Sequence, residues 1–80
     1  MLLSRITPID PYKLIKILRK IGFTPIRQKG SHVILSDGRG RRTVIPVHPG
    51  RKVKPSLVRA IISEVGISRE EYFELLRKDC

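Results

Sequence analysis

The chain has 80 residues, enough for one small domain with a modest core, which excludes a deep enclosed substrate cavity. Its only cysteine, Cys80, excludes an internal disulfide and a cysteine-based metal site, and no apolar run is long enough to span a bilayer. Both observations favour a cytoplasmic protein without a membrane segment. The formal net charge is +10, from 17 Lys and Arg against 7 Asp and Glu, so the protein is strongly basic.

The first part of the chain predicts a short leader followed by a helix. Residues 1–9 are expected to form the leader, and residues 10–80 a single domain. The helix is predicted over Pro11–Ile21, because Asp10 is a good N-cap and proline suits the first helical position. Leucines and isoleucines recur there at helical spacing, and Gly22 is expected to end the helix.

The middle of the chain favours β-structure. The predicted strands are Ile26–Lys29, Val33–Leu35 and Thr43–Val47. Gly30-Ser31 separates the first two strands, and Ser36–Gly40 has the composition of a turn between the second and third. We therefore expect an antiparallel meander of three short strands.

The last third of the chain predicts a basic loop and two helices. The loop is His48–Lys54, and the helices are Pro55–Val65 and a short one over Arg69–Arg77. Gly66 suits the end of the longer helix, and Ser68–Glu71 has the pattern of a capping box. The order of elements predicts an α+β two-layer domain whose sheet has one face covered by helices and one left for a partner.

Positive charge is concentrated in the middle of the sequence. Residues 24–60 carry nine basic groups and one acid, whereas residues 61–80 carry three basic groups and five acids. Such a cluster is typical of a polyanion binder, although it is also compatible with a surface that only maintains solubility. The Phe and Tyr residues all lie outside the basic region, so contacts with phosphates and riboses are favoured over base stacking.

The two histidines, His32 and His48, are the candidates for chemistry. RNA carries its own nucleophile, the ribose 2′-hydroxyl, so its cleavage requires only proton transfer and cations that stabilise the phosphoryl oxygens. Histidine suits either proton transfer, since its unperturbed pKa is about 6.5. Neither a metal nor a cofactor is required by this chemistry. From the residues alone, His32 is either such a group or a strand residue that faces solvent.

The register of the second hairpin governs whether the two histidines lie together. A turn with an even number of residues, such as Asp37–Gly40, pairs His32 with Ile45. His48 is then on the opposite face from His32, whereas an odd turn or a bulge puts them on the same face. Because the turn composition permits either, His32 alone is the catalytic candidate and His48 is secondary.

Five ordered motifs resemble one family, the HicA toxins. The motifs are Leu18–Phe23, Arg27–His32, Ile45–His48, Leu57–Ile62 and Gly66–Tyr72. The resemblance implies a double-stranded-RNA-binding-like α-β-β-β-α fold and the activity of an mRNA interferase, a toxin that is an RNA endonuclease. It also implies that the catalytic histidine is the one in the Gly-Ser-His motif, His32, and that a HicB antitoxin covers the active surface.

Several residues around His32 are expected to contact RNA. The first candidates are Arg27, Lys29, Gly30, Ser31, Arg41 and Arg42. The secondary candidates are His48, Lys52 and Lys54. Three alternatives stay open: a non-catalytic RNA-binding module, an inactive toxin homologue, and a subunit whose basic face only holds an acidic protein.

Overall fold

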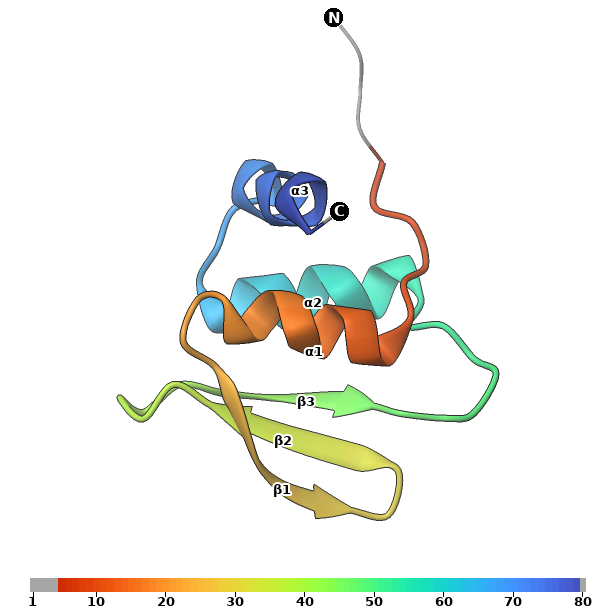
Figure 1. Cartoon of the computed structure of the whole chain (residues 1–80), viewed down its shortest axis with the longest axis vertical. Coiled ribbons are helices and arrows are strands. Elements are labelled where there is room, and N and C mark those ends of the chain that lie inside the picture. Colours follow the sequence, from red (N-terminus) through yellow and green to blue (C-terminus); the bar gives the residue numbers. More distant parts are fainter. Residues whose placement is uncertain (1–4, 80) are drawn as a thin grey trace, which may run out of the picture.

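Three strands form one antiparallel sheet in the order β1-β2-β3, with α1 and α2 on one face. This computed structural model describes residues 5–79. The elements are α1 (Pro11–Arg19), β1 (Thr24–Lys29), β2 (His32–Ser36), β3 (Arg42–Pro46), α2 (Pro55–Val65) and α3 (Arg69–Lys78). Figure 1 shows α3 on the side of the helical layer away from the sheet. The predicted α+β fold and its element order are confirmed.

The start of α1 follows from local capping. The Asp10 carboxylate accepts the backbone N–H of Lys13 at 3.1 Å, and Pro11 occupies the first turn, where no hydrogen bond from its nitrogen is needed. Both assignments agree with the prediction.

The end of α1 comes two residues earlier than predicted, at Arg19. The N–H of Ile21 bonds to the carbonyl three residues before it, so the last turn tightens and leaves the α-helical pattern. Gly22 then adopts a φ of 95°, and the N–H of Phe23 bonds back to the carbonyl of Leu18 at 3.1 Å. Phe23 is consequently buried.

The core lies between the sheet and the helices. Alternate residues of β2 and β3 point into it, including Val33, Leu35 and Ile45. The whole set of buried hydrophobic residues is Ile6, Ile9, Leu14, Ile15, Ile17, Leu18, Phe23, Val33, Leu35, Ile45, Val47, Val53, Val58, Ile61, Ile62, Val65 and Tyr72. All six residues of β1 are exposed, so this edge strand extends beyond the helical cover.

The described part of the expected leader packs against the domain. Ile6 and Ile9 are buried in the core. Ile9 and Val53 exchange two backbone hydrogen bonds, of 3.1 and 2.7 Å. Residues 5–9 therefore hold the loop that precedes α2, while residues 1–4 of the leader lie outside the described residues.

The hairpin between β2 and β3 is attached to the end of α2. The Arg41 guanidinium donates to the backbone carbonyl of Glu64 at 3.0 Å, and the Thr43 hydroxyl donates to the Glu64 carboxylate at 2.7 Å. The carbonyl belongs to the last turn of the helix, where such groups lack helical partners, so a cation there is favourable. Gly66 ends α2 with a φ of 83°, as predicted.

The C-terminal helix α3 is fixed at both ends. Ser68 and Glu71 form the predicted capping box, with bonds of 3.0 and 2.9 Å. The helix extends one residue past the predicted end, and Asp79 then pairs with Lys20 at 3.2 Å and Lys16 at 3.4 Å. Lys20, which directly follows α1, and Lys16 within it lower the pKa of the Asp79 carboxyl, whose side chain is only 4% exposed.

A methyl group at Gly66 is expected to disrupt the contact between the hairpin and α2. Its Cβ would lie 2.8 Å from an Arg41 guanidinium nitrogen, and the left-handed backbone adds a cost of roughly 1–2 kcal/mol. Gly66→Ala should therefore lower the free energy of unfolding more in the native background than in an Arg41→Ala background. Urea unfolding of the native chain, the two single variants and the double variant measures the cost of Gly66→Ala in each background. Equal costs in the two backgrounds would contradict the proposed clash.

The ion pairs of Asp79 are expected to make the docking of α3 dependent on pH. A carboxyl whose pKa is lower in the folded state stabilises the fold above its unfolded pKa, and this contribution is lost as the pH falls through the folded value. Asp79→Asn should thus reduce stability at neutral pH, with the difference from the native chain vanishing in strong acid. Urea unfolding across pH tests this, with the exposed α3 variant Glu70→Gln as the control for loss of one charge. A stability difference between Asp79→Asn and the native chain that persists in strong acid would contradict a role for the ionised carboxylate.

Candidate functional site

His32 is the first residue of β2 and directly follows a tight turn. Gly30 and Ser31 occupy the two turn positions, and only Gly30 has a positive φ, 58°, as the first position of a type II′ turn requires. Both carbonyls are engaged: that of Gly30 accepts the Gln28 side-chain amide at 3.1 Å, and that of Ser31 accepts the Val47 N–H at 2.6 Å. The Gly-Ser pair therefore fixes the position at which His32 enters the strand.

The second hairpin has the odd turn. Five residues, Asp37–Arg41, separate β2 from β3, and His32 pairs with Pro46. The even-turn alternative, in which His32 pairs with Ile45, is therefore wrong. His48 follows Pro46 by two positions, which gives it the same parity as His32. Continued alternation past the end of β3, through buried Val47 to exposed His48, puts the two histidines on the same side of the sheet.

The turn is odd because one carboxylate organises it. Asp37 accepts the backbone N–H groups of Arg39 at 2.7 Å and Arg41 at 3.0 Å, and its own N–H bonds to the Arg41 carbonyl. These bonds to the ionised form lower the pKa of the Asp37 carboxyl. Ser36 then pairs with Arg42, one residue beyond the partner that an even turn provides.

Cations surround His32 on the sheet face away from the helices. Lys29 is directly opposite His32 on β1, and Arg27 is opposite Ile34, the next outward residue of β2. All three polar side chains are exposed. Within residues 5–79, neither Arg27 nor Lys29 forms an ion pair, so their charges remain uncompensated by a nearby carboxylate.

The other predicted RNA contacts lie farther away. Arg42 is on the outward face, but at the far end of β3, four residues from Pro46, or roughly 13 Å along the strand. Arg41 lies beyond it, with its guanidinium bonded to α2. The predicted residues therefore separate into a group around His32 and a group at the other end of the sheet.

The middle of the outward face is apolar, a feature that was not among the predictions from the sequence. Val44 pairs with Ile34, and Val44 is 42% exposed. Ile26, the unpaired residue at the irregularity in β1, is also 51% exposed. The strand alternation contained a signal for this surface, since Ile34 and Val44 occupy the positions opposite in parity to the core residues.

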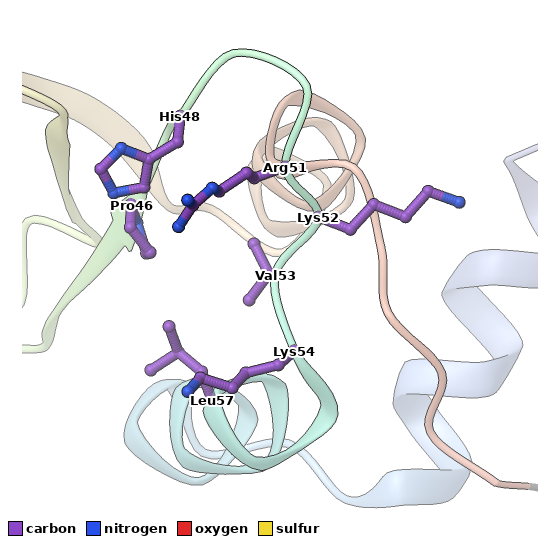
Figure 2. Close-up of a pocket in the computed structure, with 7 residues that line it drawn as sticks. All are labelled: Pro46, His48, Arg51, Lys52, Val53, Lys54 and Leu57. Carbon is purple, nitrogen blue, oxygen red and sulfur yellow. The ribbon is translucent and has the colours of Figure 1, made fainter.

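The loop after β3 borders a shallow pocket of about 340 Å³. It is lined by Pro46, His48, Arg51, Lys52, Val53, Lys54 and Leu57. Figure 2 shows the Arg51 side chain extending toward Pro46 and His48, whereas that of Lys52 points away from them. Arg51 was absent from the predicted site residues, although its place in the basic loop was a signal for it.

The part of the chain from residue 5 to residue 79 has neither a metal-binding cluster nor a membrane-spanning helix. No three His, Cys, Asp or Glu side chains gather there in an arrangement that holds a metal ion. No helix in this part of the chain is long and apolar enough to cross a membrane.

Comparison with known proteins agrees with the motifs in the sequence. A family model described as HicA toxin of bacterial toxin-antitoxin matches residues 12–67, which include the whole sheet, the basic loop and α2. No curated protein sequence matches the chain significantly. The family match confirms the resemblance drawn from the five motifs. The chain belongs to the HicA toxin family, and is thus the toxin of a bacterial toxin–antitoxin pair with an antitoxin as its partner.

Proposed function

We propose that this toxin is an mRNA interferase, an RNA endonuclease of the cytoplasm in which His32 transfers a proton without the help of a metal. The observation that carries the proposal is the position of His32. It is exposed at the start of β2, directly opposite Lys29, on a sheet face whose cations lack carboxylate partners within residues 5–79. Such a surface attracts a phosphate and presents a titratable group beside it.

The reaction uses the nucleophile that RNA supplies. The 2′-hydroxyl loses its proton, its oxygen bonds to the adjacent phosphorus, and the bond from phosphorus to the 5′ oxygen breaks. The leaving 5′ oxygen takes up a proton. The products are a 2′,3′-cyclic phosphate and a 5′-hydroxyl, and His32 performs one of the two proton transfers. Lys29 and Arg27 stabilise the added negative charge on the phosphoryl oxygens.

The turn before His32 supports this role. Gly30 has no side chain, so the backbone at the turn is open to close approach by a phosphate, and Ser31 offers a hydroxyl beside it. Because the carbonyls of this turn are already hydrogen-bonded, the backbone is held in place before RNA arrives. A site that is organised in advance loses less free energy on binding.

We propose a HicB-like antitoxin as the partner that covers this face. Ile34 and Val44 form an apolar centre that favours protein contact, and Arg27, Lys29 and Arg42 form a cationic border. An acidic, partly apolar surface is complementary to both. Such an antitoxin blocks RNA by occupying the surface that contains His32.

Replacement of His32 by alanine should abolish most RNA cleavage. Loss of a general acid or base lowers the rate by about 10²–10⁴-fold. The exposed side chain makes no hydrogen bond within residues 5–79, so the variant should keep its fold and its affinity for RNA. Multiple-turnover cleavage of purified RNA in EDTA, with end-group analysis of the products, measures the effect. Undiminished cleavage by the variant would refute the role of His32, and RNA binding without cleavage by the native chain would favour a binding module.

Arg27 should contribute to RNA affinity through its charge. In a His32→Ala background, which prevents cleavage, Arg27→Ala should weaken binding of single-stranded RNA. The slope of log K against log salt should fall by about 0.7, as expected for one lost phosphate contact. Arg19→Ala, which removes the same charge from the end of α1, is the matched control and should leave the slope unchanged. Equal effects of the two variants would indicate that only net charge matters.

A further inference from the structure

We propose that the pocket beside the basic loop is a nucleotide subsite. It binds, between His48 and Arg51, the base that is next to the scissile phosphate. The inference rests on the proposed RNA cleavage and extends it, because it assigns a group of residues to substrate selection. Neither Arg51 nor the pocket is needed for the proton transfer assigned to His32.

The pocket is continuous with the position of His32. Pro46 pairs with His32 across the sheet and also lines the pocket. The bond from the Val47 N–H to the Ser31 carbonyl joins the start of the loop to the turn that precedes His32. An RNA strand with one phosphate at His32 therefore has its neighbouring nucleotide beside the loop.

The loop begins with a turn that brings His48 and Arg51 together. The Arg51 N–H donates to the His48 carbonyl at 3.0 Å. Pro49 and Gly50 occupy the two central positions, and Gly50 has a φ of 73°, as a type II turn requires. The first and last Cα atoms of such a turn lie within about 7 Å of each other. The turn thus presents an imidazole and a guanidinium as a pair.

These two groups suit a nucleobase better than a simple anion. His rings and Arg guanidinium planes both stack on unpaired bases in RNA-binding proteins. Below them, Pro46, Val53 and Leu57 supply an apolar floor, and the pocket volume of about 340 Å³ lies within the range of small-ligand sites. The absence of Phe and Tyr from this region does not therefore exclude stacking.

The charges around the pocket suit the sugar–phosphate backbone. Within residues 5–79, the charged groups of Arg51, Lys52 and Lys54 have no ion-pair or hydrogen-bond partner. In Figure 2 the Lys54 side chain extends across the pocket toward Leu57, while Lys52 points away. Lys54 is thus the cation placed to contact a phosphate of the bound nucleotide.

His48 has a competing role, which the test must separate from stacking. It lies on the same side of the sheet as His32, so it is also placed to take the second proton transfer. A phenylalanine stacks on a base but cannot transfer a proton, whereas an alanine does neither. His48→Phe and His48→Ala therefore distinguish the two roles.

The experiment measures kcat/KM and cleavage-site preference for the native chain and for His48→Ala, His48→Phe and Arg51→Ala. Substrates are short RNAs that differ at one nucleotide beside the cut. Both alanine variants should lower kcat/KM about tenfold and weaken the preference for one nucleotide beside the cut. His48→Phe should keep the native kcat/KM and the native preference. Arg39→Ala, which removes an exposed charge from the β2–β3 turn at the other end of the sheet, is the matched control and should change neither.

Two results would overturn the subsite while leaving RNA cleavage intact. One is that His48→Phe is as slow as His48→Ala, which assigns proton transfer to His48. The other is that both alanine variants match the native chain. Titration of the native chain with AMP, CMP, GMP and UMP, followed by backbone NMR, provides a readout independent of activity. Shifts confined to residues 46–57 support the subsite even if RNA cleavage fails, and their absence for all four nucleotides overturns it.

Discussion

The hydrogen bond from the Val47 N–H to the Ser31 carbonyl, at 2.6 Å, closes the end of the sheet on which the proposed site depends. It joins the turn before β2 to the segment after β3, two parts of the chain that the sheet alone would leave free to separate. The bond extends the pairing of β2 and β3 past His32 and Pro46, so the basic loop begins beside the Gly-Ser turn. The β1–β2 turn, this loop and the start of α2 lie at the same end of the molecule (Figure 1).

Charge is divided between the two layers in a way that suits a binding surface. The ion pairs found in residues 5–79 lie within or between α1, α3 and the residues that directly follow them, Lys20 and Asp79. There, Asp79 and Glu74 neutralise neighbouring lysines and Arg77. The sheet face and the basic loop have no such pairs. Their mutual repulsion opposes folding, and a bound polyanion or acidic partner relieves it. Ligand and antitoxin should therefore stabilise the same fold in addition to competing for one surface.

Local signals in the sequence were sufficient for most of the fold but not for the arrangement of the site. The bounds of α2, the Asp10 cap and the Ser68–Glu71 capping box follow from neighbouring residues, and each was predicted correctly. The hairpin register was not predictable, because the Asp37 carboxylate selects a five-residue turn that composition does not distinguish from four. The hydrogen bond from the Arg41 guanidinium to the Glu64 carbonyl was not predictable either, since the two residues lie 23 positions apart in the sequence.

The type II turn at Pro49 and Gly50 has a consequence for how such a toxin changes over time. The backbone of this turn is set by two residues, while Ile9 holds the far end of the loop at Val53. The side chains at positions 48, 51 and 54 are exposed and contribute little to the packing of the core. Under the proposed function, selection can therefore alter these positions, and with them the RNA preference proposed for the pocket, without first finding a compensating change in stability. The residues that hold the loop in place are therefore different from the exposed residues that line the pocket, and only the exposed residues are free to diversify.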